Sequence, residues 1–260
     1  MKIKNFLLAT GVVLVTVFCF SCSELKAIFK DDGDEDDEIS SSSSSSGGDN
    51  TLSSSSVPAP DAGSLTDSRD SQTYRTVQIG SQTWMAENLN YNAAGSKCYN
   101  NIASNCNTYG RLYNWSVAMN FNASCNESDC IGQINTPHKG ICPSGWHIPS
   151  NAEWSVLIAA VGGENIAGAE LKAGSGWKSN GNGTDGYGFS ALPGGTCMSI
   201  LSFMDYFDLV GDYGYWWTAD ESYGPYALFR SISYNEDGIG LFDLDKPAMM
   251  SVRCVKDSAP

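Results

Sequence analysis

Cysteine and histidine are the residue types in this chain that could hold a metal or attack a substrate. Nine cysteines and two histidines are present, and seven of the cysteines follow residue 90. Their spacings match no zinc motif, and His138 and His147 are not arranged as a pair of metal ligands. With no metal motif, disulfide formation is the chemistry that we predict for so many cysteines, and it requires an oxidising compartment.

The cysteine spacings favour two short disulfides and one long one. The expected pairs are Cys98–Cys106, Cys125–Cys130 and Cys142–Cys254. The long pair would tie the end of the domain to its middle, and such a loop closure contributes about 4 to 5 kcal/mol in the chain-entropy model. Cys197 is then left over. It is either buried and inert or takes one of the partners above, because spacing alone does not determine connectivity.

Motifs for enzymatic catalysis are absent from the sequence. It contains no G-x-S-x-G, no H-E-x-x-H and no phosphate-binding loop. Adjacent acids occur at Asp220-Glu221 and at Glu236-Asp237, but such pairs usually lie in solvated turns. We therefore expect a domain that is not an enzyme and that needs no cofactor.

Calcium is the one metal for which the chain offers candidate ligands. Asn180, Asn182 and Asp185 place side-chain oxygens along a Gly-rich loop, and calcium prefers oxygen ligands in flexible loops. The competing interpretation is a Gly/Asn turn that needs positive φ angles. The turn is the interpretation that we favour, with calcium as the alternative.

Aromatic side chains beside carboxylates are the best candidates for a ligand-binding surface. Nine Trp and Tyr residues fall between residues 177 and 226. Flat rings next to carboxylates could grip a sugar ring by stacking and by hydrogen bonds to its hydroxyls, although most of these aromatics are expected in the core. Neighbours on a strand face opposite ways, so one of Trp216 and Trp217 should point outward or toward a loop. The candidate ligand-binding residues are Trp216, Trp217, Tyr213, Tyr223 and Asp220.

The elements that must position these residues suggest an α+β domain with a small irregular antiparallel sheet and two to three short helices. Residues 76–85 alternate around Gly80-Ser81, which predicts a hairpin with a two-residue turn. Ser150 and Glu153 form a capping box in front of an apolar face, which predicts a helix that ends at Gly162-Gly163. Further helices are expected within 109–120 and 165–173, and strands at 146–148, 215–218, 227–233 and 250–255.

The N-terminus resembles a bacterial lipoprotein signal. Two lysines precede an apolar run over residues 6–20, which is typical of a secretory signal rather than of a membrane span. The run ends in Ser21-Cys22, which is similar to a lipobox, so we expect cleavage after residue 21 and lipidation of Cys22. Several acyl chains on one cysteine provide stable membrane anchoring. The alternative is an ordinary cleaved signal without lipid.

Residues 22–72 have the composition of a disordered tether. An acidic block at 31–38 and seven serines at 40–46 leave too little apolar surface to offset the entropy of ordering. The formal net charge of the chain is −14, and neither the tether nor the rest of the chain has a basic patch. Nucleic acids are therefore poor partners. Residues 73–260 have the length of one domain.

Beyond residue 74 the sequence resembles the Fibrobacter succinogenes major paralogous domain. The segments that carry the resemblance are TVQIGSQTWMAENLNY at 76–91, YGRLYNW at 109–115, CPSGWHIPSNAEW at 142–154, DGYGFSALPGG at 185–195, YWWTADE at 215–221 and SVRCVKD at 251–257. Some of them are also similar to bacterial domains with the C-type-lectin-like fold. The resemblance implies that fold, and it independently implies the pair Cys142–Cys254.

Surface or secreted proteins, often lipoproteins, make up this family, so the resemblance also implies a place in the cell envelope. We expect a lipid-anchored protein of the outer membrane or cell surface with a non-catalytic recognition domain. Its partner would be a carbohydrate, as in adhesion. The alternative is an envelope protein as partner, or a structural role. An enzyme related to the formylglycine-generating group is less favoured, because the cysteine pair of that group has no counterpart here.

Overall fold

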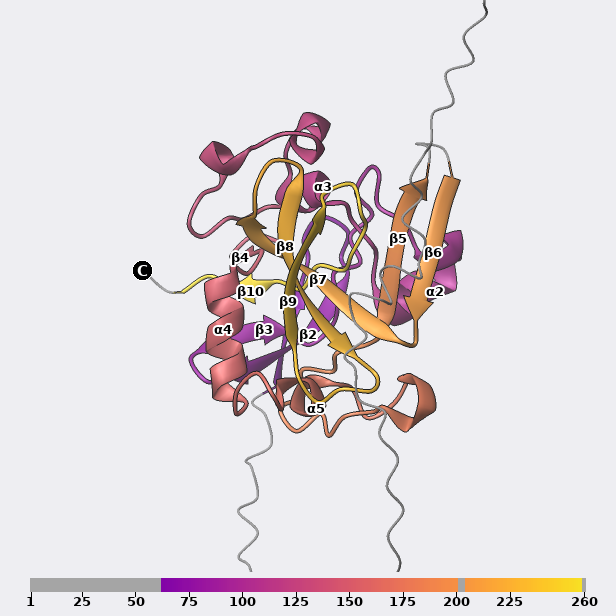
Figure 1. The fold of residues 1–260 in the computed structure, drawn as a ribbon. Coiled ribbons are helices and arrows are strands. Elements are labelled where there is room, and N and C mark those ends of the chain that lie inside the picture. The colour runs from indigo at the N-terminus through magenta and orange to yellow at the C-terminus, as the bar shows by residue number, and fades with distance from the viewer. Residues whose placement is uncertain (1–61, 201–203, 259–260) are drawn as a thin grey trace, which may run out of the picture. The chain divides into compact units, whose positions relative to one another are not determined.

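The computed structural model describes residues 62–200 and 204–258, and it contains the hairpin predicted around Gly80-Ser81 (Figure 1). β2 (Thr73–Ile79) pairs antiparallel with β3 (Gln82–Met85), and Ile79 faces Gln82 across a two-residue turn. Gly80 has a φ of 57°, which glycine adopts without strain. Buried and exposed residues alternate along β2, so one face of the hairpin packs on the core.

An additional strand precedes this hairpin and shifts the start of the domain. β1 (Ala62–Thr66) pairs antiparallel with β2, although these residues lie within the segment 22–72 that we expected to be a tether. Asp67 follows β1, is almost completely buried, and accepts a hydrogen bond from Arg69 at 2.6 Å. The amino-acid composition did not indicate this strand, because the strand has no apolar face of its own. Backbone hydrogen bonds to β2 hold it in place. Cys22, the signal and the acidic block lie outside the described residues.

The first sheet brings both ends of the domain together. Its strand order is β1-β2-β3-β10-β4, with β4 (Trp146–His147) and β10 (Val255–Lys256) both short. The strand that we predicted over residues 250–255 is wrong except for its last residue. The segment before β10 instead forms single bridges to three different parts of the domain, Met249 to Cys197, Met250 to Tyr113 and Ser251 to Trp216. It crosses between sheets and therefore never pairs continuously with one neighbour.

Two further antiparallel sheets replace the single small sheet expected from the sequence. β7 (Tyr213–Glu221), β8 (Tyr226–Ser233) and β9 (Gly240–Asp245) form a three-stranded sheet, and β5 (Gly194–Ile200) pairs with β6 (Met204–Val210). The strands predicted at 215–218 and 227–233 lie inside β7 and β8. No strand was predicted for β5, β6 or β9, whose sequences mix glycine, polar and apolar residues without a clear period.

Four α-helices of five to ten residues occur in the described part of the chain, where two to three were expected. The capping box is confirmed for α4 (Asn151–Ala160), where Ser150 and Glu153 bond each other's backbone N–H. α5 (Ala167–Leu171) lies within the predicted range 165–173. The helix predicted over 109–120 is shorter: α3 spans Trp115–Met119, and Leu112 and Tyr113 form strand-like bridges instead.

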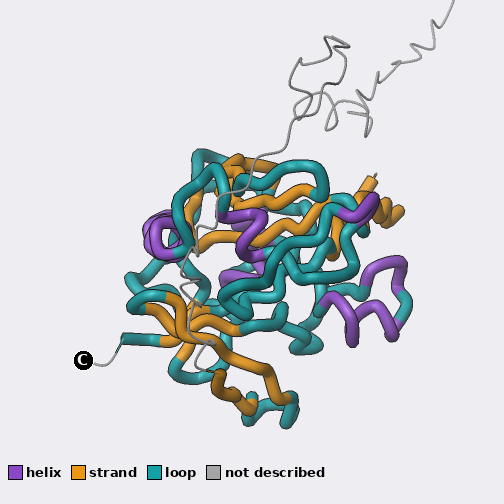
Figure 2. Tube along the Cα trace, turned by 90° about the horizontal axis from the view of Figure 1, so that it is seen from below, coloured by secondary structure: helices purple, strands orange, loops and turns teal. Residues whose placement is uncertain are grey.

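The fourth helix and the single-turn helices lie in loop regions. α2 (Ala103–Tyr109) was not predicted, because its residues have no apolar period, and the disulfide Cys98–Cys106 holds it to the preceding turn. The 3-10 helices are η1 (Tyr99–Asn101), η2 (Ala123–Asn126), η3 (Ile131–Gln133) and η4 (Lys178–Asn180). Loops and turns form much of the remaining trace (Figure 2). None of the described helices has the length and apolar character that a membrane span needs.

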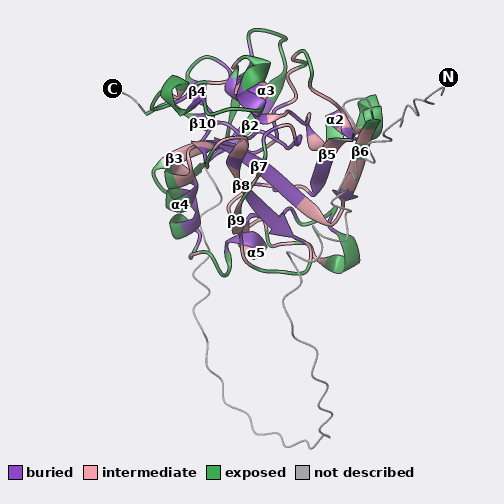
Figure 3. Ribbon diagram, turned by 45° about the horizontal axis from the view of Figure 1, so that its top comes forward, coloured by how far each residue is buried: buried purple, intermediate pink, exposed green. Residues whose placement is uncertain are grey.

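Apolar side chains gather on both sides of β7. Trp216 belongs to a cluster with Trp84, Trp154 and Phe189, which α4 covers. Trp217, the next residue, belongs to the other large cluster, together with residues of α3 and of β8. β7 is therefore a central strand with both faces in the core, and most of it is drawn as buried in Figure 3.

Three disulfides join segments within this fold. They are Cys98–Cys106, Cys125–Cys130 and Cys142–Cys254, the pairs that the spacing favoured. Cys197 is the free cysteine of the described chain and is buried. The long disulfide links the loop before β4 to the residue before β10, so it fixes the two short strands that close the first sheet.

Candidate functional site

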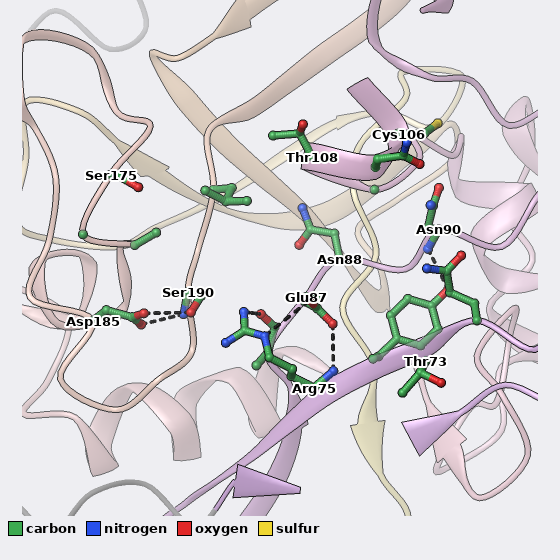
Figure 4. A pocket seen from close by; sticks show the side chains of 18 residues that line it. Thr73, Arg75, Glu87, Asn88, Asn90, Cys106, Thr108, Ser175, Asp185 and Ser190 are labelled. Carbon is green, nitrogen blue, oxygen red and sulfur yellow. Dashed lines mark hydrogen bonds and ion pairs between the residues drawn. The ribbon is translucent and has the colours of Figure 1, made fainter. Parts of the chain in front are cut away.

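A polar cleft of about 360 Å³ opens between β2, the segment after β3, α2 and the loop that follows α5 (Figure 4). We call this site the polar cleft. Its lining comprises residues 72–75, 86–88, 90, 106–108, 110, 173–175, 185, 190 and 192. Amide, hydroxyl, carboxylate and guanidinium groups dominate this set. The cleft therefore differs from the mostly apolar pockets that bind drug-like molecules.

Asn88 forms the centre of the cleft floor. Its side-chain oxygen accepts hydrogen bonds from Arg253 Nη2 at 2.8 Å, Arg253 Nε at 3.1 Å and Trp216 Nε1 at 2.8 Å. Its side-chain nitrogen donates to the Tyr109 carbonyl oxygen at 2.9 Å and to Ser251 Oγ at 3.2 Å. One buried amide thus joins the hairpin, α2, β7 and the C-terminal segment.

Arg253 supplies a buried positive charge beneath this floor. Its guanidinium lies 4.3 Å from the centre of the Phe189 ring and also donates to the carbonyl oxygens of Phe189 and Ser190. Burial lowers the pKa of Arg253 to about 9, against the opposing effect of the Asp185 and Glu87 carboxylates. No carboxylate forms an ion pair with Arg253 among residues 62–200 and 204–258.

Two fixed pairs form the rim of the cleft. The Arg75 backbone N–H donates to Glu87 Oε2 at 2.7 Å, and the two side chains form an ion pair at 3.4 Å. Across the cleft, Ser190 donates from its backbone N–H and its hydroxyl to the Asp185 carboxylate, both at 2.7 Å. Figure 4 shows the Arg75–Glu87 pair just below Asn88 and the Asp185–Ser190 pair at a separate place to the left. The rim therefore holds charged groups of both signs in defined positions.

Other polar groups of the cleft have no partner within the described chain. No hydrogen bond there engages the side-chain amides of Gln72, Asn90 and Asn107 or the Ser175 hydroxyl. These groups are exposed or half-buried, so a ligand could replace the water that solvates them. Amides and hydroxyls both donate and accept, which matches a ligand that carries many hydroxyl groups.

Comparison with known proteins identifies a family. The model of the Fibrobacter succinogenes major domain matches residues 77–256, which is more than half of the chain. The chain belongs to the Fibrobacter succinogenes major domain family. No curated protein and no solved structure matched. Several segments that carried the resemblance in the sequence meet at the floor of the polar cleft, where they contribute Asn88, Ser190, Trp216 and Arg253.

Trp216 and Trp217 are both completely buried in this Fibrobacter family domain, so neither ring offers a surface to a ligand in this structure. We expected one of the two to point outward or toward a loop, but both side chains are 0 % exposed. The alternation along the strand is correct, since the two rings enter different clusters. The outward-pointing alternative is wrong because both faces of β7 are packed in the core. Trp216 still supports the site, because its indole N–H bonds the floor residue Asn88.

The other three aromatic-surface candidates lie apart from the cleft. Tyr223 is 65 % exposed in the turn between β7 and β8, where its ring centre lies 5.0 Å from that of Tyr226. Tyr213 is half-buried and stacks on Tyr215 at 5.4 Å. Asp220 accepts a hydrogen bond from the Asn151 backbone N–H at 2.5 Å, so it stabilises the first turn of α4. The structure does not bring these three residues together with the polar cleft.

The calcium candidates act as turn residues in this structure. Asn182 accepts a hydrogen bond from the Trp177 backbone N–H at 3.0 Å, and Asp185 is engaged with Ser190. Asn180 and Asp185 have φ angles of 59° and 49°. No cluster of three or more acidic, histidine or cysteine side chains suited to a metal occurs in the described part of the domain. Asp185 nevertheless belongs to the site, as a rim residue of the cleft.

The histidines and the free cysteine are all engaged or buried. His147 lies between Glu153 and Asp257, with both nitrogen–oxygen distances at 2.7 Å. His138 Nε2 donates to the Met119 carbonyl oxygen at 2.9 Å. Cys197 is 0 % exposed, and burial raises the pKa of its thiol to about 11. None of these three side chains lines the polar cleft.

Asn88 and Arg253 are the functional candidates that sequence reasoning missed. They are 165 residues apart and have no local pattern that marks them. One sequence signal is indirect: each residue stands inside a segment that resembles the family, ENLN for Asn88 and SVRC for Arg253. A single arginine in an otherwise apolar C-terminal segment could also have indicated a buried hydrogen-bond hub.

Proposed function

We propose that this chain is a lipid-anchored cell-envelope protein whose folded domain is a non-catalytic recognition domain, and that the polar cleft binds carbohydrate. The observation that carries the proposal is the set of unengaged amides around a rigid floor. Gln72, Asn90 and Asn107 offer donors and acceptors toward the cleft, while Asn88 and its partners hold the floor in place.

The size and charge of the cleft favour a small, hydroxyl-rich ligand. A volume of about 360 Å³ is near the lower end for ligand pockets, which suits one or two sugar units. The charged side chains of the rim are already paired with each other or with Ser190, so they can accept and donate without demanding a charged ligand. A carbohydrate would replace the solvating water with hydroxyls of the same hydrogen-bonding capacity.

The proposed fold is the C-type-lectin-like fold. The support is the disulfide between Cys142 and Cys254, which connects the loop before β4 to the last strand, and the pairing of β10 with both β3 and β4. That arrangement brings the ends of the domain into one sheet.

A non-catalytic role agrees with the chemistry of the possible nucleophile and bases. The Cys197 thiol is buried with a raised pKa, so it is not a thiolate at neutral pH. Both nitrogens of His147 face carboxylates, and the Nε2 of His138 is engaged by a backbone carbonyl. None of these groups could serve as an accessible base without rearrangement.

The envelope location rests on the N-terminal sequence. Lipidation at Cys22 would anchor the mature chain, and the acidic, Ser-rich segment would let the domain stand away from the membrane. Mass spectrometry of the protein purified from its native envelope should detect an acylated N-terminal cysteine. An unmodified N-terminus would contradict the anchoring part of the proposal.

A glycan panel tests the binding part of the proposal. The full chain in detergent is incubated with immobilised oligosaccharides and with insoluble polysaccharides, and depletion from solution is measured. We expect retention on at least one neutral glycan, unchanged by a calcium chelator because Asn182 and Asp185 are already engaged within the protein. Folded protein that no glycan retains would contradict carbohydrate recognition, and an envelope protein captured in its place would support the protein-binding alternative.

A further inference from the structure

A second hollow of about 450 Å³ lies on a different part of the domain, and we call it the basic hollow. It is formed by the turn between β1 and β2, the segment that follows β3, the end of α3 and the loop before β4. It shares no lining residue with the polar cleft. The side chains that define it are Arg69, Tyr91, Asn92, Asn120, Phe121 and Lys139.

The charge of this hollow is opposite in sign to that of the chain. Arg69 and Lys139 line it and no carboxylate does, whereas the whole chain has a formal net charge of −14. The polar cleft, in contrast, is lined by Arg75, Glu87 and Asp185. A basic hollow on an acidic protein selects for a negatively charged ligand group.

Arg69 is a fixed part of the wall. It bonds the buried Asp67 carboxylate through Nε and Nη2 at 2.9 and 2.6 Å, and its Nη1 donates to the Ile141 carbonyl oxygen at 2.8 Å. Burial would raise the pKa of Asp67, but the bonds from Arg69 and the nearby Lys139 keep that pKa below its usual value. Asp67 therefore neutralises Arg69, and Lys139 provides the net positive charge.

Lys139 is the cation that remains available. Its ammonium donates one hydrogen bond, to the Cys142 carbonyl oxygen at 3.0 Å, and an ammonium has three N–H groups. No acidic side chain forms an ion pair with it in the part of the chain that the structure describes. Lys139 is exposed, so a ligand can reach it.

The other walls suit the ring and hydroxyls of a sugar. The Arg69 guanidinium lies 3.9 Å from the centre of the Tyr91 ring, which fixes that aromatic, and Phe121 is half-buried and lines the same hollow. Asn92 and Asn120 are exposed, and no hydrogen bond to a described residue engages their side-chain amides. Apolar ring surface, amides and one free cation are therefore present within a single concave site.

We propose that the basic hollow is a second binding site, and that its ligand is an acidic saccharide. Lys139 pairs with the carboxylate of a uronic acid unit, Asn92 and Asn120 bond its hydroxyls, and Tyr91 and Phe121 contact its carbon surface. The proposal does not depend on the polar cleft, because the two sites have separate linings.

The test measures binding of acidic and neutral oligosaccharides to the full chain in detergent by calorimetry. The probes are oligomers of galacturonate and glucuronate and their neutral galactose and glucose counterparts of equal length. We expect binding of at least one acidic series, weakened by salt, and weaker or no binding of its neutral counterpart at this site.

The central variant is Lys139→Gln, with Lys256→Gln as its control, because Lys256 is also exposed and forms no ion pair within residues 62–200 and 204–258. Loss of a charge-assisted hydrogen bond should weaken acidic binding about 10- to 100-fold in Lys139→Gln. Lys256→Gln should leave it unchanged, and Lys139→Arg should retain most of it. Asn120→Gly removes an amide but keeps the φ of 56° accessible, so it should bind several-fold more weakly while folding normally.

Four results would overturn the inference. They are no binding of any acidic oligosaccharide, equal binding of acidic and neutral series, equal effects of Lys139→Gln and Lys256→Gln, and preferential binding of acidic peptides. The polar-cleft variant Asn90→Ala/Asn107→Ala separates the two proposals, since it should leave acidic binding intact.

Discussion

At the scale of single residues, Asn88 is the position whose loss should be most costly. Asn88→Ala would leave two N–H groups of Arg253 and the indole N–H of Trp216 without their acceptor in the core. Three buried unsatisfied donors, two of them on the charged guanidinium, cost about 3 to 5 kcal/mol in total. Urea unfolding should show a loss of this size.

The matched control for Asn88 is Asn107→Ala. Asn107 is exposed in the same cleft and no described partner engages its amide. Its replacement should change the free energy of unfolding by less than about 0.5 kcal/mol. Equal effects of the two substitutions would show that Asn88 is not the hub of the floor.

His147 should titrate above its ordinary pKa of 6.5. Burial acts to lower the pKa, but hydrogen bonds to Glu153 and Asp257 raise it. The stabilisation from charged His147 is therefore fully present below about pH 6.5 and is lost as the pH rises through the raised pKa. For Glu153 burial acts to raise the pKa but the bonds to His147 and Ser150 lower it, so its contribution is lost only as the pH falls below 4.5 through the lowered pKa.

Proton NMR of the His147 ring measures this pKa directly. We expect a value above 6.5 in the natural chain and a lower value in Asp257→Asn, which keeps the shape of the side chain but removes one carboxylate. As the pH rises above 6.5, the free energy of unfolding should fall by less in that variant than in the natural chain. A pKa at or below 6.5 in the natural chain would contradict the arrangement of the three side chains.

At the scale of elements, the disulfides should differ in what they contribute. Cys142–Cys254 spans 112 residues and Cys98–Cys106 spans 8. The chain-entropy model gives about 5 kcal/mol for the first closure and about 2.5 kcal/mol for the second. Replacing both cysteines of a pair by alanine should therefore lower the free energy of unfolding by about 2 kcal/mol more for the long pair. Equal losses in thermal or urea unfolding would show that loop length does not govern their effect.

The elements that were predicted correctly are those marked by a clear sequence signal within the element itself. Gly80-Ser81 indicated the hairpin and the Ser150–Glu153 capping box indicated α4, because each signal and its structure lie within a few residues. The strands β1, β5 and β6 also pair with the strand next to them in sequence, but no clear apolar alternation marks them, whereas the true extent of α3 depends on bridges to residues outside the helix. In the segment before α3, bridges from Leu112 to Lys97 and from Tyr113 to Met250 override the helical period.

Contacts between residues far apart in the sequence also explain why the candidate site was predicted only in part. The tryptophan pair at 216–217 was correctly assigned to a strand, but burial of both faces requires α4 on one side and α3 with β8 on the other. The polar cleft could not be predicted, because its floor joins Asn88 to residues more than 100 positions away. Only the resemblance to the family indicated these segments together, and it did so without showing that they meet.

At the scale of the whole molecule, the described domain presents two separate concave sites with different charge. The polar cleft has fixed rim charges of both signs, and the basic hollow has a single free cation. Both are built on backbone segments that the three sheets and the long disulfide hold in place. Two separate sites on one domain would be suited to contact with extended polysaccharides.

The affinity of the polar cleft for its best neutral oligosaccharide, measured by calorimetry, tests the central claim most directly. The variant Asn90→Ala/Asn107→Ala removes two unengaged amides of the cleft, and Gln78→Ala/Asn135→Ala removes two exposed amides outside it. The account predicts that the cleft variant binds at least about 10-fold more weakly while the control binds like the natural chain. Unchanged affinity of the cleft variant, in a protein that is folded and retains the glycan, would contradict the account.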